Sequence, residues 1–380
     1  MKKVVVITEE ERLDRLRLIR TENVGPVSYL HLLRRYGSAK AALEALPHLA
    51  SRGGRSAAIT IYPRELAEQE TETLAAAGGH FIALGEADYP PALAAIEDAP
   101  PVISLIGQPL WKDRRCVALV GARNASASGR RLAEELARDL GAAAFVVVSG
   151  MARGIDGAAH KGAMASGTIA VLAGGVDNIY PPEHEDLYRR IAETGAVISE
   201  MPVGTIPQAR HFPRRNRVIS GLSLGVLAVE AALQSGSLIT ARLALEQGRE
   251  VMAVPGSPLD PRCRGTNNLL RQGAVLVESA ADVLAALEGA SGLSSSKTLT
   301  FELADQPAEI SNESLPDGGL EAVAALLGPT PIAVDELTRW CQLSAPVVRA
   351  ALLELDLAGR LEWHPGNRIS LLLTNKAQRS

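Results

Sequence analysis

The chain contains 380 residues, of which 47% are apolar and 22% charged, and its formal net charge is −4. This length predicts two or three domains, and the composition is that of an ordinary soluble globular protein. Aromatic residues make up only 3% of the sequence, which argues against RNA or single-strand readers built on platforms of stacked rings. Cys116, Cys263 and Cys341 have no paired spacing, so we expect neither a disulfide framework nor a zinc cluster. With no segment resembling a signal peptide or a membrane span, the sequence predicts a cytoplasmic protein without membrane contact.

Residues 1–80 are predicted to form a helical domain. Apolar residues recur at helical spacing in 9–20, 27–36 and 39–46, and Gly25-Pro26 separates the first two segments. A helix, a Gly-Pro turn and a second helix resemble a helix-hairpin-helix or sterile-alpha-motif-like bundle. A plain helical bundle explains the same pattern equally well.

Residues 81–288 alternate between apolar runs of strand length and helical segments. The runs lie at 116–120, 145–148, 169–172, 197–198, 226–229, 251–254 and 275–277. Continuous apolar strands that alternate with helices indicate a parallel sheet covered on both faces. We therefore predict an α/β fold, an extended Rossmann-like doubly wound sheet.

The C-terminal part is predicted to be a linker, 289–318, followed by a winged helix, 319–375. The linker loses periodicity and gathers Ser, Gly, Pro and Asp, whereas three short helices and a hairpin follow it. The third helix carries Arg349 against Glu354 and Asp356, and an acidic recognition helix repels phosphate. We expect a protein-contact or regulatory role here; DNA contact through Arg360 and Arg368 of the hairpin is the alternative.

The stretch 201–229 contains no Asp or Glu, although the whole chain is mildly acidic. Its positive charge is concentrated in the run Arg210-His211-Phe212-Pro213-Arg214-Arg215-Asn216-Arg217. Such a local positive region indicates a polyanionic ligand, and nucleic acid is the first candidate.

Several glycine-containing loops follow the predicted strands and open helices. In a parallel sheet these loops meet at the carboxyl edge, where glycine lets the backbone approach a phosphate and unpaired helix-start amides donate to it. The predicted DNA-binding residues are Gly121, Arg123, Ser149, Gly150, Arg153, Gly154, Arg214, Arg215, Asn216, Arg217, Ser235, Gly236 and Ser237. Each glycine taken alone is equally explained by a tight turn between strand and helix.

Two titratable residues near these loops, Asp156 and His160, allow structural explanations as well. Asp156 would either pair with Arg153 and shape the loop or contact a ligand. His160 lies one helical turn beyond Asp156, but a third metal ligand is not evident, so we expect no metal site.

Known catalytic motifs do not fit the chain. It has no Gly-x-x-x-x-Gly-Lys-Ser/Thr run, no Gly-x-Gly-x-x-Gly fingerprint after the first parallel strand and no Gly-x-Ser-x-Gly elbow. Glu230 at a strand end is the best candidate for a general base, yet one carboxylate does not make an active site. We therefore expect neither catalysis nor a cofactor.

Taken in order, these loops resemble the DNA-processing A family, also called DprA or Smf. The resemblance rests on Tyr89-Pro90-Pro91-Ala92-Leu93, Val120–Arg123, Ser149–Asp156 with Ala159-His160, Tyr180-Pro181, Ser199-Glu200, Phe212–Arg217, Glu230, Ser235–Thr240 and Pro255-Gly256. It covers residues 88–277 without a gap. The helical N-terminal domain and the C-terminal winged helix also resemble additions found in that family.

Membership implies a protein that binds and protects incoming single-stranded DNA, forms a homodimer and loads the RecA recombinase during natural transformation. The implied strand-binding set is Arg123, the loop 149–154, the run 214–217 and the turn 235–237. Pro181-Pro182-Glu183 departs from relatives with a basic residue after the Tyr-Pro pair, which removes one phosphate contact. More distantly, the domain resembles nucleoside-monophosphate phosphoribohydrolases, so a nucleotide-processing enzyme using Glu230 is the alternative.

Overall fold

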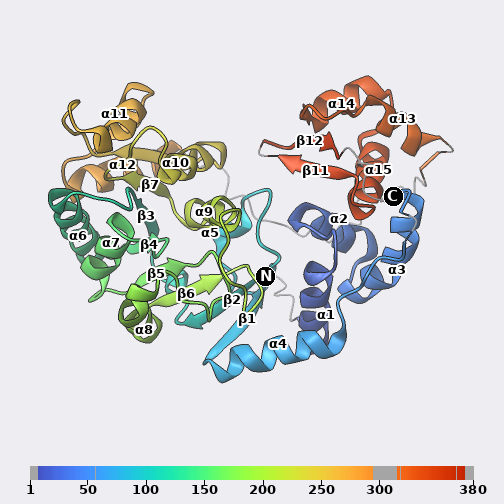
Figure 1. Cartoon of the computed structure of the whole chain (residues 1–380), viewed down its shortest axis with the longest axis horizontal. Coiled ribbons are helices and arrows are strands. Elements are labelled where there is room, and N and C mark those ends of the chain that lie inside the picture. Colours follow the sequence, from blue (N-terminus) through green and yellow to red (C-terminus); the bar gives the residue numbers. More distant parts are fainter. Residues whose placement is uncertain (1–6, 56, 294–314, 317, 365, 373–380) are drawn as a thin grey trace, which may run out of the picture. The chain divides into compact units, whose positions relative to one another are not determined.

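In the computed structural model, the described residues are 7–55, 57–293, 315–316, 318–364 and 366–372. The chain divides into two compact units. The α/β unit contains residues from Gln69 to Phe301, and the terminal unit joins Ile7–Glu68 to the C-terminal residues that begin at Glu302 (Figure 1). The predicted linker, 289–318, lies mostly outside the described residues, and its first residues continue a helix that ends at Leu293.

The α/β unit is built on a nine-stranded sheet in the order β1-β2-β6-β5-β4-β3-β7-β8-β9. The run β6-β5-β4-β3-β7-β8-β9 is parallel throughout. At one edge of the sheet, β2 pairs antiparallel with β6, and β1 pairs antiparallel with β2. The strands are β1 Gly79–Ala83, β2 Val102–Gly107, β3 Cys116–Val120, β4 Val146–Ser149, β5 Thr168–Val171, β6 Ala196–Ser199, β7 Gly225–Ala228, β8 Glu250–Ala253 and β9 Val275–Leu276. The predicted doubly wound sheet is confirmed.

Helices cover both faces of this sheet because its central strands are apolar along their whole length. Every residue of β3, β4 and β7 is buried, and α6, α7 and α12 share one apolar core with them. The helices of the unit are α4 Arg64–Ala76, which begins in the terminal unit, α5 Pro91–Ala94, α6 Ala127–Ala142, α7 Ile155–Ala163, α8 Glu185–Thr194, α9 His211–Leu222, α10 Gly236–Glu246, α11 Arg264–Arg271 and α12 Ala280–Leu293. Short 3-10 helices occupy Leu110–Lys112, Pro182–His184 and Pro261–Cys263.

The sheet reverses its winding direction at β3. The chain first proceeds from β3 to β4 and β5 on one side, and later returns to place β7 on the other side of β3. In doubly wound sheets such a reversal opens a crevice at the carboxyl ends of the two strands, and ligands bind there. The loops that follow β3 and β7 are therefore the first place to look for a site.

The terminal unit combines helices from both ends of the chain. Helices α1 Glu9–Arg20, α2 Pro26–Tyr36 and α3 Ala39–Arg52 form the N-terminal bundle, in which Thr8 and Ser38 cap α1 and α3 and Gly37, at φ 77°, ends α2. The winged helix consists of α13 Gly319–Leu326, α14 Val334–Cys341, α15 Ala345–Leu357 and a sheet of β10 Ile332–Ala333, β12 Arg368–Leu371 and β11 Leu361–His364. Both predicted flanking folds are confirmed.

Helix α15 belongs to two apolar cores at once. Val348, Leu352 and Leu355 pack inside the winged helix, whereas Leu353 and Leu357 pack among the leucines of the N-terminal bundle. The two ends of the chain are thus held together by burial of apolar side chains. Among the described residues, no helix is both long and apolar enough to cross a membrane.

Candidate nucleic-acid interface

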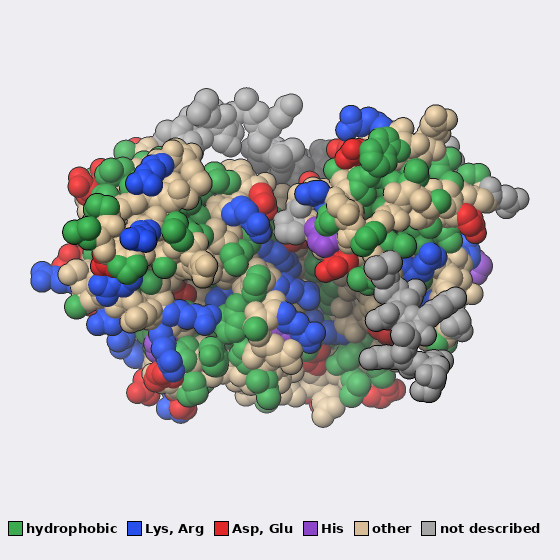
Figure 2. Space-filling view, turned by 45° about the horizontal axis from the view of Figure 1, so that its top comes forward, with side chains coloured by type: hydrophobic (Ala, Val, Ile, Leu, Met, Phe, Trp, Pro, Cys, Tyr) green, Lys and Arg blue, Asp and Glu red, His purple; other side chains and the backbone are tan. Residues whose placement is uncertain are grey.

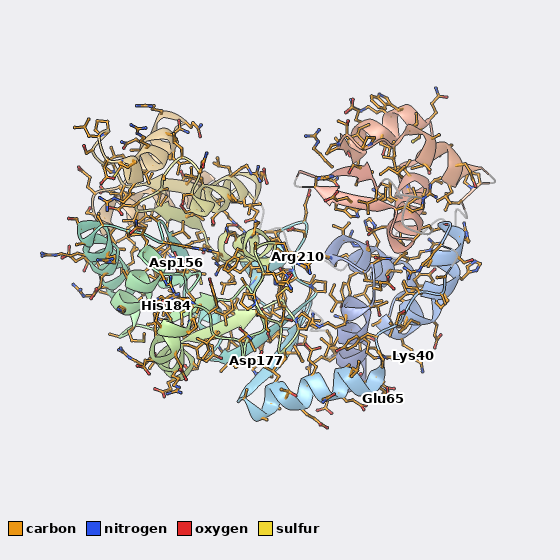
Figure 3. The ribbon with its side chains drawn as sticks, in the orientation of Figure 1. Lys40, Glu65, Asp156, Asp177, His184 and Arg210 are labelled. Atoms are coloured by element: carbon orange, nitrogen blue, oxygen red, sulfur yellow. The ribbon has the colours of Figure 1, made fainter. Side chains whose placement is uncertain are left out.

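The loop between β4 and α7 is shaped by buried polar groups. The carboxylate of Asp156 accepts hydrogen bonds from the backbone N–H groups of Gly150, at 3.2 Å, and Ala152, at 3.3 Å. Burial raises the pKa of Asp156, while the neighbouring Arg215 opposes that shift. Ser149 is fully buried and donates to the carbonyl of Leu119 at 2.6 Å. Asp156, which Figure 3 labels, and the buried Ser149 therefore organise this loop from inside the domain.

Two glycines of this loop are required by close packing. A Cβ at Gly150 would lie 2.4 Å from Nη1 of Arg215, and a Cβ at Gly154 would lie 2.2 Å from the carbonyl oxygen of Ala122. Gly154 also adopts a φ of 78°, which L side chains rarely tolerate. Gly154 lets the loops after β3 and β4 approach each other, and Gly150 leaves room for the guanidinium of Arg215.

Arg215 and Arg217 lie inside the α/β unit, which corrects the prediction that they form part of an exposed basic surface. Arg215 is 5% exposed and donates to the carbonyls of Gly150 and Val171. Burial lowers its pKa to about 10. Arg217 is 6% exposed and forms ion pairs with Glu200 and Asp98.

Other arginines of the predicted set remain exposed, as does Arg210 of the basic stretch, which was not in that set. Arg123 and Arg210 project from the surface, and the side chain of Arg214 is 47% exposed although its Nε donates to Glu200 at 3.1 Å. Arg153 is exposed and pairs with Glu183, and not with Asp156. Lys and Arg side chains gather in a row on the α/β unit in Figure 2, and Figure 3 labels Arg210.

An aromatic pair stands beside the exposed arginines. The rings of Tyr180 and Phe212 meet edge to face with their centroids 5.8 Å apart, and Tyr180 is 47% exposed. The guanidinium of Arg123 lies 4.8 Å from the centroid of Phe212, a cation–π contact. The low aromatic content concealed this pair, whose two members come from distant segments. The Tyr-Pro and Phe-Pro dipeptides in two predicted loops were the signal available in the sequence.

The turn before α10 extends the same surface. Ser235 accepts a hydrogen bond from the N–H of Ser237 at 3.3 Å and so caps the helix, while Gly236 is exposed. Asn216 is buried and donates from its side chain to the carbonyl of Gly236 at 3.3 Å. Asn216 therefore positions this turn from the neighbouring helix α9.

The Glu230 carboxylate occupies the helix start at which doubly wound folds usually bind phosphate. Its two carboxylate oxygens accept from the N–H of Ser126 at 2.9 Å and from the hydroxyl of Ser126 at 2.5 Å. A Cβ at Gly129 would lie 2.4 Å from the carboxyl carbon of Glu230. The carboxylate thus occupies the N-terminus of α6, where nucleotide-binding relatives of this fold hold phosphate. Gly121 lines the same junction, since its Cβ would lie 2.9 Å from the carbonyl oxygen of Glu230.

The histidines near these loops are engaged within the domain. Nδ1 of His160 lies 2.9 Å from the hydroxyl oxygen of Thr168, and burial lowers the pKa of His160 to about 3. Nδ1 of His211 accepts from the N–H of Gln208 at 3.2 Å. Within the described residues, no three His, Cys, Asp or Glu side chains are grouped so that they could hold a metal ion.

Family models match the whole arrangement. Residues 80–288 match DNA recombination-mediator protein A, residues 9–73 match a DprA-like N-terminal HHH domain, and residues 306–367 match a DprA winged helix domain. The chain belongs to the DprA/Smf family of DNA recombination mediators. This confirms the resemblance found in the loop motifs. The residues matched by the first family model, 80–288, lie in the α/β unit.

Individual relatives agree with this family. The chain is 38% identical to Protein Smf of Escherichia coli over 314 residues, or 82% of each chain, and 44% identical to DNA processing protein DprA of Bacillus subtilis over 209 residues, which cover 54% of this chain and 70% of the relative. The structure of DprA from Streptococcus pneumoniae aligns with a TM-score of 0.61 at 33% identity, covering 73% of this chain and 98% of that one. A structure described as giving insight into the unique single-stranded DNA binding mode of DprA from Helicobacter pylori aligns with a TM-score of 0.51 at 28% identity, covering 56% of this chain and 96% of that one.

Proposed function

We propose that this protein binds single-stranded DNA as a recombination mediator, without catalysing a reaction. The observation that carries the proposal is the exposed surface formed by Arg123, Arg210 and Arg214 beside the rings of Tyr180 and Phe212. Guanidinium groups bind phosphate oxygens, and aromatic rings stack on bases without strong sequence preference. A relative described as binding single-stranded DNA supports this assignment.

The predicted site residues divide into two roles. We assign phosphate contact to Arg123, Arg214, Arg210 and, once it leaves Glu183, Arg153. The others shape the loops or fill the junctions between them: Gly121, Ser149, Gly150, Gly154, Arg215, Asn216, Arg217, Ser235, Gly236 and Ser237. Of these, Gly236 is exposed and also presents its backbone to the strand.

The wider role follows from the family. We propose that the protein acts in the cytoplasm as a homodimer, protects incoming single strands and loads the RecA recombinase onto them during natural transformation. Membership of a recombination-mediator family supports this proposal. The enzymatic alternative would require a free carboxylate at Glu230, and both oxygens of that carboxylate are bound to Ser126.

Fluorescence anisotropy with a labelled oligonucleotide tests the binding proposal. The wild type should prefer single strands to duplex, and its log–log salt slope should change by about 0.7 for each phosphate contact removed. The double variant Arg123→Ala/Arg214→Ala should bind at least tenfold more weakly with a shallower slope. Arg138→Ala, which removes an exposed charge toward the far end of α6, is the matched control. Equal binding by the double variant and the control would refute the proposed surface.

A further inference from the structure

The outward face of α15 is docked on the N-terminal bundle. Ser28 donates to the carboxylate of Asp356, Asn23 donates to the carbonyl of Leu357 at 3.3 Å, and Arg52 pairs with Glu354 at 3.2 Å. The close approach depends on Gly53, where a Cβ would lie 2.0 Å from a carbonyl oxygen of α15. These contacts add to the burial of two leucines of α15 in the bundle core.

This docking covers the acidic residues of α15 that the sequence suggested would repel DNA. The third helix of a winged helix is the one that reads a DNA groove, but here Glu354 and Asp356 are 1% and 9% exposed against the bundle. They are therefore covered by protein and do not repel phosphate in solvent. What remains open on this side of α15 is its first half, which carries Arg349.

A cavity of about 480 Å³ lies at that open half. It is lined by α2, α14, α15 and the hairpin, through His31, Thr338, Arg339, Arg349, Trp363 and Asn367 among others. The volume falls within the range of small-molecule sites and is sufficient for a mononucleotide. Because both the bundle and the winged helix contribute to the wall, the cavity exists only while α15 is docked.

The charge of the cavity is unbalanced toward the positive. Arg339 and Arg349 both line it, and among the described residues no carboxylate lies within ion-pair distance of either guanidinium. Asp335 is the one acidic residue in the lining. The imidazole of His31 has no hydrogen-bond partner among the described residues, and burial, together with the charges of Arg34 and Arg349, lowers its pKa to about 4. Nε of Arg339 donates to the backbone carbonyl of Asp335 at 3.2 Å, which leaves its charge without a carboxylate partner. Guanidinium groups without carboxylate partners around a cavity of this size suit an anion.

We propose that this cavity binds a small phosphate-bearing molecule of up to mononucleotide size. Arg349 and Arg339 would hold the phosphate group, His31 and Asn367 would donate further hydrogen bonds, and Trp363 would contact the remainder of the ligand. A ligand held by α2, α14 and α15 together stabilises the docked state, since it binds that state alone. The site is separate from the arginines of the α/β unit that contact DNA.

Calorimetric titration of the full chain with inorganic phosphate, pyrophosphate and AMP at low salt tests the proposal. At least one should bind saturably and quench the fluorescence of Trp363, measured in a Trp111→Phe/Trp340→Phe background. Arg349→Ala should weaken binding at least tenfold. Lys40→Ala removes an exposed charge from α3 of the same unit, outside the cavity, and should leave binding unchanged.

The absence of saturable binding by all three probes would overturn the proposal. So would an equal loss of binding in the Arg349→Ala and Lys40→Ala variants. Binding of a duplex oligonucleotide with none of the small probes would also overturn it, in favour of a polymeric phosphate backbone. Arg123→Ala should retain the small ligand, so a failure of the strand-binding surface and a failure of this cavity are told apart.

Discussion

Replacing Arg217 tests whether this side chain stabilises the fold or contacts DNA. The side chains of Arg217 and Glu200 are only 8% and 5% exposed, and each is the other's ion-pair partner. Arg217→Ala removes one guanidinium partner of the buried Glu200 carboxylate, while Nε of Arg214 still donates to that carboxylate at 3.1 Å. Removing one partner of a buried pair costs about 3–5 kcal/mol, and the remaining Arg214 contact favours the lower end. The second partner, Asp98, is 46% exposed and adds little.

We therefore expect the free energy of unfolding of the α/β unit to fall by about 3 kcal/mol in Arg217→Ala. Urea unfolding followed by Trp111 fluorescence, in a Trp340→Phe/Trp363→Phe background, reports this unit alone. Single-strand affinity per folded molecule should change less than twofold. Replacing both members, as in Arg217→Met/Glu200→Gln, should recover part of the stability because no unpaired charge remains buried. Wild-type stability combined with a large loss of DNA affinity would refute the reasoning.

Three further changes probe the same molecule. Burial raises the pKa of Asp356 to about 6, so the folded state binds a proton that the unfolded state releases above pH 4; stability of the terminal unit should rise by about 3 kcal/mol as the pH falls from 7 to 4, and urea titrations of Asp356→Asn should lose this rise. Gly53→Val should shift the thermal midpoint of the terminal unit downward by several degrees while leaving that of the α/β unit in place, because its Cβ would clash with α15. Phe212→Leu should weaken single-strand binding by about 1–3 kcal/mol without altering the salt slope, and an altered slope would show that phosphate contacts moved as well.

The fold could be predicted because its signals are local and repeated. Continuous apolar strands alternate with helices, and the spacing alone identifies a parallel sheet and places the loops at one edge. The basic stretch was also visible, but the exposure of its members was not. Arg217 can be buried because its charge is paired with Glu200 and Asp98. These two partners lie 17 and 119 residues earlier in the chain. A charge pattern along the sequence does not show which carboxylates from distant segments the fold places beside an arginine.

The docking of α15 was hidden for a related reason. The sequence shows two acidic residues on a recognition helix, which indicates repulsion of DNA. Ser28, which donates to Asp356, and Arg52, which pairs with Glu354, lie some three hundred residues earlier. The protein-contact or regulatory role of the winged helix stays a prediction. Nothing local in the sequence pairs these two ends.

The position of Glu230 explains how a fold that commonly binds single nucleotides could bind a DNA strand, as proposed above. In doubly wound folds the first helix after the sheet reversal donates its free N–H groups to a phosphate. Here the Glu230 carboxylate accepts from that helix start at Ser126, so the crevice is already filled by an anion of the protein itself. Under the proposed function, phosphate is then bound outside the crevice, where Arg123 and Arg214 are exposed. An open surface accepts a chain of phosphates, whereas a closed nest at a helix start accepts only one or two.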